Sequence, residues 1–374
     1  MTSRRELIVG GAALALAGSA ARAEDDGPLP EDGYYEVIEN LHSNRLWSIR
    51  QGKPFHLQPI GNVTVIDQAD GLVMVDSGGS PGSGRRIVER VRSVSRKPVK
   101  ALILTHWHGD HPLGLSEILK AWPEARTIAT EATRAHLSDS KTMNAPGAPD
   151  VAANARMVGK YKGFAGYCGE QAAAATEPKE RAGWAAGQRL FTQYARDMDG
   201  ALTIAPKEGF TDRLVIDDPD QPVECLFLGR ANTDGDALVW MPRQRCLITG
   251  DVLVNPIPFG FGSYPAEWIA VIRKILAMDV GTYVPGHGPP MSNNRYLVKV
   301  GALIQHTLSQ IRALPAGTSM EKARALLNQD GWAAMFVGDD PWLKRWFRSY
   351  WSDPIIASAW KEANGAPIEQ SLGG

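Results

Sequence analysis

Three of the chain's eight histidines stand within residues 106–111, in the segment HWHGDH, with an aspartate among them. The packing of a core gives no reason for that crowding, whereas imidazole and carboxylate groups together suit zinc or a similar divalent ion. On one tight turn, alternate side chains can point to two adjacent metal positions. His106 and His108 would serve one position, and Asp110 with His111 the other. The segment therefore predicts a metal centre.

The elements that must position this segment are strands, since a predominantly apolar run over residues 99–104 leads directly into it. Further strands, bounded by Gly and Asp turn signals, are predicted over residues 45–50, 62–67, 71–75, 213–216, 223–228, 237–241 and 246–249, with a short one ending at Tyr283. Apolar residues at helical spacing predict helices over residues 83–95 and 266–278. The second should turn Trp268, Ile269, Ile272, Ile275 and Leu276 inward.

Four other segments accompany the histidine cluster: Val75-Asp76-Ser77-Gly78, Gly229-Arg230-Ala231-Asn232-Thr233-Asp234, Thr249-Gly250-Asp251 and Pro285-Gly286-His287-Gly288. With the H-x-H-x-D-H pattern ending at His111, they resemble in type and order the motifs of the metallo-β-lactamase fold superfamily. The resemblance covers roughly residues 45–290. It implies that Asp76 braces the histidine loop, that Asp251 bridges two metals and that His287 closes the second metal site. Judged from the residues alone, Asp76 and Asp251 could instead only cap a turn or a loop.

One position departs from the family pattern. The family usually has a histidine where this chain has Asn232, and no histidine lies between His136 and His287 to replace it. An amide oxygen is a weak zinc ligand beside an imidazole. We therefore expect one tightly held zinc or other divalent ion and a second, weaker one. The expected ligands are His106, His108 and Asn232 for the first ion, and Asp110, His111 and His287 with Asp251 for the second.

The resemblance also implies a function. A bound divalent metal lowers the pKa of water and polarises a carbonyl oxygen, and Asp110 would orient the water or accept its proton as the catalytic residue. No G-x-S-x-G element supplies a separate nucleophile. The expected enzyme is a metal-dependent hydrolase of a small lactam, lactone or ester. Alternatives are a non-hydrolytic member of the fold, such as an iron-dependent sulfur-oxidising enzyme, and a degenerate binding protein; Asn232 counts against the first and favours the second.

The expected fold class is α/β, a four-layer α/β/β/α sandwich over residues 24–293 with the ligands at one sheet edge. Residues 24–45 are acidic and irregular, and an Ala-rich, Lys/Glu-rich stretch predicts a helical insertion over about residues 131–205. Residues 294–374 are expected to form a C-terminal helical extension. There Thr318 and Glu321 make a capping-box pattern, and a last helix should run from Asp353 to Gly365.

Several other residues have an ordinary structural interpretation. Phe259, Phe261 and Tyr264, together with Trp107, predict either an apolar pocket wall or simple packing of the loop. Five tryptophans of the extension are expected to pack it onto the core: residues 332, 342, 346, 351 and 360. Cys225 and Cys246 are interpreted as small core side chains. His42, His56, His136 and His306 are taken as ordinary surface or core residues.

The first 23 residues have the features of an export signal. Arg4 and Arg5 precede an apolar run over residues 7–21, and Ala21-Arg22-Ala23 resembles a cleavage site. The arginine pair resembles a twin-arginine signal, although an ordinary secretory signal can also carry two arginines. The run is too short to anchor the chain in a membrane, so a periplasmic or secreted product is expected. The chain has 40 Lys+Arg against 41 Asp+Glu and no basic stripe, which argues against nucleic acid as a partner.

Overall fold

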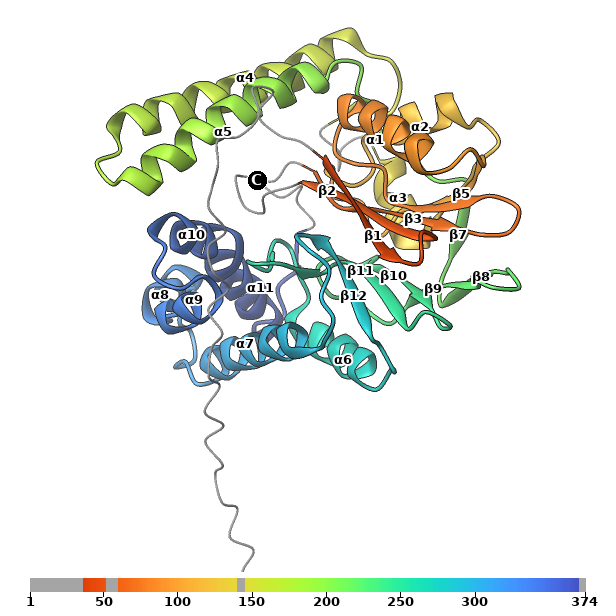
Figure 1. Ribbon diagram of the computed structural model, residues 1–374. Coiled ribbons are helices and arrows are strands. Elements are labelled where there is room, and N and C mark those ends of the chain that lie inside the picture. Colours follow the sequence, from red (N-terminus) through yellow and green to blue (C-terminus); the bar gives the residue numbers. More distant parts are fainter. Residues whose placement is uncertain (1–35, 52–59, 140–144, 370–374) are drawn as a thin grey trace, which may run out of the picture.

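The computed structural model describes residues 36–51, 60–139 and 145–369, and it contains two β-sheets (Figure 1). The first sheet has seven strands in the order β1-β2-β3-β4-β5-β6-β7, and the second has five in the order β12-β11-β10-β9-β8. The first is formed by β1 (Glu36–His42), β2 (Leu46–Gln51), β3 (Val63–Asp67), β4 (Leu72–Val75), β5 (Val99–Ile103), β6 (Arg126–Thr130) and β7 (Glu208–Phe210). The second is formed by β8 (Arg213–Ile216), β9 (Val223–Phe227), β10 (Ala237–Met241), β11 (Cys246–Val254) and β12 (Thr282–His287).

Successive side chains of a strand point to opposite faces of its sheet, so the strands contribute to two separate hydrophobic cores. In β4, Val73 and Val75 point into a core shared with side chains of the second sheet, such as Val239 and Ile248. Leu72 and Met74 point to the opposite face and pack in the core beneath the helices. This period-two pattern is what a strand covered on both faces requires.

Helices cover the outer face of each sheet, which gives the predicted four-layer sandwich (Figure 1). Over the first sheet lie α1 (Pro81–Val94), α2 (Leu115–Ala121) and α3 (Glu131–Ser138). Over the second lie α6 (Pro265–Leu276) and α7 (Arg295–Arg312), which pack against each other. The C-terminal extension is therefore continuous with the outer helical layer. No helix of the described residues is both long and apolar enough to cross a membrane.

Two helical regions extend beyond the sandwich. The first is an antiparallel pair, α4 (Val151–Ala174) and α5 (Pro178–Asp197), which runs along one side of the molecule (Figure 1). The second contains α8 (Met320–Leu326), α9 (Asp330–Val337), α10 (Pro341–Trp346), the π-helical turn η1 (Phe347–Ser352) and α11 (Asp353–Ala363). The two regions meet where Trp184 of α5 contacts Trp342 and Trp346, at ring-centroid distances of 5.1 and 5.6 Å.

Several details differ from the sequence-based expectations. Residues 36–42 are not irregular but form edge strand β1, antiparallel to β2. Leu276 is 37% exposed, because α6 ends there and turns it away from the core. The N-cap of α8 is Ser319, whose hydroxyl accepts a hydrogen bond from the Lys322 amide, rather than Thr318. α2, β6 and β7 were not predicted. The proposed signal and His56 lie outside the described residues.

The buried cysteines and tryptophans have the expected roles. Cys225 and Cys246 lie in the core between the sheets, and both are free thiols. Trp342, Trp346 and Trp351 are buried in the core beneath the helices, while Trp332 and Trp360 are only partly buried against it. The last helix ends before Gly365, which has a φ of +64°, as the sequence predicted.

Candidate metal centre

The loop after β5 brings the histidine cluster to the edge of the sandwich. Strand β11 brings Asp251 to the same place, and β12 ends there with His287. The side chains form two groups whose nitrogen or oxygen atoms lie within 4.8 Å of one another. One group consists of His106, His108 and Asp251; the other consists of Asp110, His111 and His287.

Asp251 lies between the two groups. One carboxylate oxygen is 3.6 Å from Nε2 of His106, while the other is 3.3 Å from Nε2 of His111 and 3.6 Å from Nε2 of His287. The family resemblance implied that Asp251 bridges two metals, and the structure places it between the two groups. His106 and His108 make a set of three side chains only with Asp251, whereas Asp110, His111 and His287 make three without it; three protein ligands are usual for a catalytic zinc.

The nitrogen and oxygen atoms of these side chains are suited to bind a cation. Within the described part of the chain, Nε2 of His106, Nε2 of His111 and both carboxylate oxygens of Asp251 are buried and have no hydrogen-bond partner. Buried polar atoms in proteins are nearly always satisfied, so such a cluster needs an explanation. A divalent ion with imidazole and carboxylate ligands would satisfy all four atoms.

Asp76 braces the histidine loop from behind. Its carboxylate accepts hydrogen bonds from the backbone amide of Thr105 at 2.8 Å and from the Thr105 hydroxyl at 2.9 and 3.1 Å. It also lies 2.9 Å from Nδ1 of His111. A carboxylate on Nδ1 fixes the tautomer that leaves Nε2 free to bind a metal. Asp76 has a φ of +64°, a strained conformation for a residue other than glycine.

Two glycines allow the backbone to approach this centre. A Cβ atom on Gly286 would collide with the carboxylate of Asp251 and with the backbone of Gly250. A Cβ atom on Gly61 would collide with the imidazole of His111. The amide of Gly61 also donates to the carbonyl of Asp110 at 2.9 Å. The backbone just before β3 therefore packs closely against the loop that carries Asp110 and His111.

Burial and mutual charge set the ionisation of these groups. Burial lowers the pKa of His106 and of His108, which keeps both imidazoles neutral. Burial alone would lower the pKa of His111, but the charges of Asp110, Asp251 and Asp76 raise it well above its ordinary value. Burial would raise the pKa of Asp110, but His111 and His287 hold it below its ordinary value. Burial would likewise raise the pKa of Asp251, but the neighbouring histidines hold it at about 2, so Asp110 and Asp251 are ionised at neutral pH.

Asp110 is the most accessible of the six side chains. Its side chain is 21% exposed, and its Oδ2 lies 2.9 Å from Nε2 of His287 and 3.7 Å from Nε2 of His111. An ionised, partly exposed carboxylate at this edge can hold a water molecule or receive its proton. That placement agrees with the catalytic role expected for Asp110.

Asn232 is fully buried, and its side-chain amide donates to the carbonyl of Phe259 at 2.8 Å. This bond ties the third motif to the loop that follows β11. Its Oδ1 is buried without a hydrogen-bond partner among the described residues. The oxygen is thus free for a metal, a water molecule or a substrate group.

Of the two roles that the sequence left open for Trp107, the structure supports packing rather than a pocket wall, because the side chain is fully buried. Its ring stacks on His136 of α3 at a centroid distance of 4.6 Å. Nε2 of His136 lies 2.9 Å from the carboxylate of Asp234 in the third motif. His136 therefore packs directly behind the ligand loop. Its position 98 residues before Asp234 gave no signal in the sequence.

The loop after β11 presents its aromatic side chains differently. Phe259 packs on His287 at 5.1 Å between ring centroids, and Phe261 is only partly buried. The guanidinium of Arg230 instead stacks on the ring of Tyr264, with Cζ 4.1 Å from the ring centroid. Phe259 and Phe261 therefore line the approach to the centre, whereas Tyr264 fastens the loop.

The helical pair α4–α5 also reaches the centre. The hydroxyl of Tyr194 donates to the carbonyl of Gly79, in the loop after Asp76, at 2.7 Å. Its ring meets the ring of Tyr161 edge to face at 4.7 Å. Burial raises the pKa of Tyr161 to about 12, and the charge of Asp110 adds to that effect. The insertion therefore forms one side of the site.

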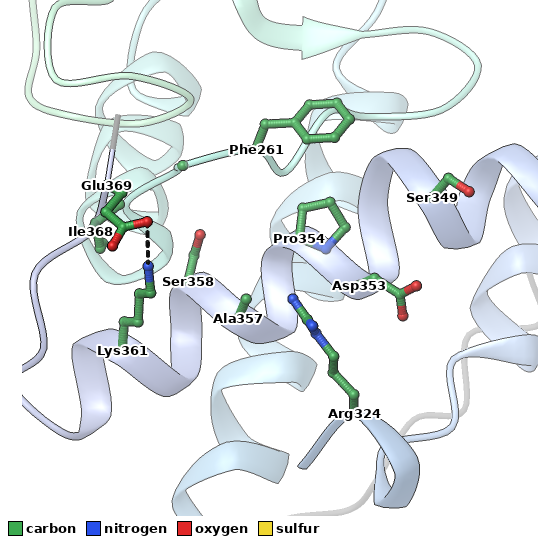
Figure 2. Close-up of a pocket in the computed structure, with 11 residues that line it drawn as sticks. Phe261, Arg324, Ser349, Asp353, Pro354, Ala357, Ser358, Lys361, Ile368 and Glu369 are labelled. Atoms are coloured by element: carbon green, nitrogen blue, oxygen red, sulfur yellow. Dashed lines mark ion pairs between the residues drawn. The ribbon is translucent and has the colours of Figure 1, made fainter. Parts of the chain in front are cut away.

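A cavity of about 270 Å³ lies on the other side of Phe261, against α11 (Figure 2). Phe261 and Pro354 line it near one end, and an ion pair of 3.8 Å between Lys361 and Glu369 lies at the other. None of the six candidate ligands lines this cavity. It is thus distinct from the metal centre.

The model of the metallo-beta-lactamase superfamily matches residues 58–287. A linear primary-alkylsulfatase from a Pseudomonas species is 25% identical over 264 residues, which are 66% of this chain and 45% of the relative. A metallo-beta-lactamase type 2 from Bacteroides fragilis is 28% identical over 22% of this chain and 36% of its own length. The chain thus matches less than half the length of these curated relatives.

A solved structure extends the likeness in fold. The stereoselective inverting sec-alkylsulfatase from a Pseudomonas species superimposes with a TM-score of 0.58 at 14% identity. The match covers 90% of this chain and 51% of that protein. It therefore reaches well beyond residues 58–287 and includes much of the helical regions outside the sandwich.

Proposed function

Because the chain belongs to the metallo-beta-lactamase superfamily, we propose that it is a zinc-dependent hydrolase that uses a metal-activated water on the carbonyl group of a small ester, lactone or lactam. One observation carries the proposal. Two groups of three His and Asp side chains converge at one edge of the sandwich, and the buried donor atoms of three of these side chains lack other partners.

Each residue of the site has its own role in the proposed reaction. A bound divalent ion supplies an acidified water and a Lewis acid for the carbonyl oxygen. Asp110 remains ionised, and a carboxylate with a lowered pKa orients a water better than it holds a proton. Asp76 holds the tautomer of His111, and buried Asp251 keeps the two groups together. Phe259 shields His287 from solvent on the loop side.

The loop over residues 255–264, NPIPFGFGSY, supports a substrate with an apolar group beside the scissile bond. It carries no Lys or Arg that could bind an anionic group. Phe259 and Phe261 instead offer aromatic surface next to the centre. A neutral ester or lactone with an alkyl or aryl substituent fits that lining.

A second candidate is the hydrolysis of alkyl sulfates. The observation in its favour is that the relative matched over 66% of this chain is a linear primary-alkylsulfatase. An alkyl chain would suit the aromatic lining equally well. The sulfate group would then depend on the metal ions and on Asn232 for its contacts, because the 255–264 loop offers no cation.

We also propose that the protein is exported and begins at or near Glu24. The paired arginines, the short apolar run and the Ala21-Arg22-Ala23 ending support this. N-terminal sequencing of the protein from a periplasmic or culture fraction should give a start near Glu24. Sequence beginning at Met1 in that fraction would exclude cleavage.

A substrate panel tests the function. Zinc-loaded protein is assayed on nitrophenyl esters of increasing chain length, on γ- and δ-lactones, on a chromogenic cephalosporin and on dodecyl sulfate. The carbonyl proposal predicts turnover of an ester, lactone or lactam that is lost in His287→Ala. Turnover confined to dodecyl sulfate would select the second candidate. No turnover of any class by protein with a full metal content would contradict both.

A further inference from the structure

The second metal group, formed by Asp110, His111 and His287, is assembled from both sheets. Asp110 and His111 follow β5 of the first sheet, whereas His287 ends β12 of the second (Figure 1). Their ligand atoms nevertheless converge, and Oδ2 of Asp110 lies 2.9 Å from Nε2 of His287. Strand pairing cannot set that distance, because β5 and β12 belong to different sheets. Contacts between the sheets at this edge must therefore set it.

Gly61 and Asn62, just before β3 of the first sheet, make such contacts with both ligand segments. The amide of Gly61 donates to the carbonyl of Asp110 at 2.9 Å, in the loop after β5. The amide of Asn62 donates to the carbonyl of Gly286 at 2.7 Å, in β12. Two consecutive amides thus bind the two segments that carry the ligands, and they hold one segment against the other.

The side chain of Asn62 makes further contacts with the His287 segment. It is buried, and its Nδ2 donates to the carbonyls of Pro285 and Gly288, both at 2.8 Å. A carboxamide carries two donors on one nitrogen and can bind both carbonyls at once, whereas a serine hydroxyl offers one donor and a carboxylate none. With the bond from its backbone amide, Asn62 therefore makes three hydrogen bonds to the backbone on either side of His287.

His287 depends on its backbone more than the other histidine of the second metal group does. Nδ1 of His111 lies 2.9 Å from the carboxylate of Asp76, which orients that ring. Nδ1 of His287 is buried and has no hydrogen-bond partner among the residues that the structure describes. The ring of His287 is therefore placed by the backbone that Asn62 holds and by packing on Phe259.

We propose that Asn62 is a positioning residue of the second metal group: through the carbonyls on either side of His287, it holds that histidine where Asp110 and His111 can share one ion with it. This inference rests on the proposed function, since it takes these three side chains as metal ligands. It gives the short segment before β3 a role in metal binding, which Asn62 exerts through His287.

Gln68 offers a matched control at the other end of the same strand. Its side chain is buried, and its Nε2 donates to the carbonyls of Gln221 at 2.6 Å and Ile216 at 3.4 Å. Like Asn62, it is a buried carboxamide that joins the end of β3 to backbone carbonyls of a distant segment. At about 3.3 Å per residue, β3 keeps the two side chains roughly 20 Å apart. Asn62→Ala and Gln68→Ala should therefore both lower the melting temperature of the metal-free protein, because each leaves buried carbonyls without a donor.

Zinc binding distinguishes the two variants. Dissociation constants are measured by competition with a chromophoric chelator, for each variant alone and for Asn62→Ala combined with His287→Ala. Asn62→Ala should weaken the binding of one ion about 10-fold, as expected when the support behind a metal-binding histidine is lost, and Gln68→Ala should weaken neither. In the His287→Ala background, Asn62→Ala should not change the affinity for the ion that remains, because the ligand through which Asn62 acts is gone.

A role of Asn62 in general stability alone would give different results. Asn62→Ala would then melt at a lower temperature but bind zinc as the wild type does, or Gln68→Ala would lose as much zinc affinity, or the loss would be as large in the His287→Ala background. Any of these results would overturn the proposal. If Asn62→Ala does not fold, Asn62→Ser, which keeps one hydroxyl donor, is measured in the same way and judged by the same results.

Zinc binding and turnover separate this inference from the proposed function. If the zinc-loaded wild type hydrolyses no substrate of the panel but Asn62→Ala loses zinc affinity as expected, the proposed function fails and the positioning role stands. If the wild type hydrolyses a substrate and Asn62→Ala binds zinc with unchanged affinity, the positioning role fails and the proposed function stands. A wild type that binds no zinc would overturn both.

Discussion

Replacing Asp76 by asparagine tests how far the bracing of the ligand loop controls metal binding. Asp76 is 2% exposed and receives the amide and hydroxyl of Thr105 on one side and Nδ1 of His111 on the other. Asparagine has nearly the same shape but only one acceptor oxygen. If its NH2 group faces His111, Nδ1 must accept, and the proton moves to Nε2, the atom that should bind metal. If the NH2 group instead faces Thr105, it meets the amide and hydroxyl of Thr105, which are donors too, and these groups lose their acceptor.

The magnitude follows from these two choices. Loss of a carboxylate partner behind a metal-binding histidine costs about 10- to 100-fold in metal affinity, or about 1.4 to 2.7 kcal/mol. A buried donor left without an acceptor costs about 1 to 3 kcal/mol of stability even without metal. Both effects should therefore appear, one in the zinc dissociation constant and the other in the urea midpoint of the metal-free protein.

Competition with a chromophoric chelator measures the first quantity, and urea unfolding of chelator-treated protein measures the second. The matched control is Asp70→Asn, since Asp70 has 73% of its side chain exposed and pairs with Lys100 on the surface. That variant should behave as wild type, because exposed ion pairs contribute little. Wild-type zinc affinity together with a wild-type urea midpoint in Asp76→Asn would refute the assignment of Asp76 as a brace.

Three further predictions follow from the same geometry. His287→Ala should lose one bound ion and all hydrolysis while remaining folded by circular dichroism; full metal content and full activity would make the ligand assignment wrong. Asn232→His should raise the metal retained after dialysis towards two equivalents, because it adds an imidazole to the group of His106; two equivalents in the wild type and no change in the variant would defeat this. Zinc binding at pH 7 to the group of Asp110, His111 and His287 should release at least one proton, since the raised pKa of metal-free His111 keeps it protonated there. For the same reason zinc affinity should rise with pH, and calorimetry in buffers of different ionisation enthalpy would show no proton release if this is incorrect.

The sequence predicted the sandwich because its strands are short, apolar and separated by clear turn signals. β2, β3, β4, β5 and β8–β11 were expected near their observed positions, whereas β7 was not expected and β12 begins close to where the predicted strand should end. β1 was missed because its residues 36–42, EVIENLH, are polar enough for an edge strand with one exposed face. β6 was missed because RTIAT is too short to show a period.

The candidate ligands could be predicted because they stand in compact motifs with chemistry that packing does not explain. The bridging position of Asp251 was expected from the family resemblance alone, because the residues by themselves left a role in capping a loop open. Tyr161 and Tyr194 were missed because each lies far along the chain from the motifs, in a helical region whose position beside the site depends on tertiary contacts. For Trp107 the sequence left a pocket wall and simple packing open, and its burial against His136 supports packing.

The central claim is that the convergent His and Asp side chains hold a metal that performs hydrolysis. The most direct measurement follows one protein preparation through removal and return of the metal, with ester and lactone turnover assayed at each stage. The account predicts turnover by the loaded protein, its loss after chelation and dialysis, and its recovery on adding zinc in proportion to the metal bound. Turnover that persists unchanged in the fully stripped protein would contradict it.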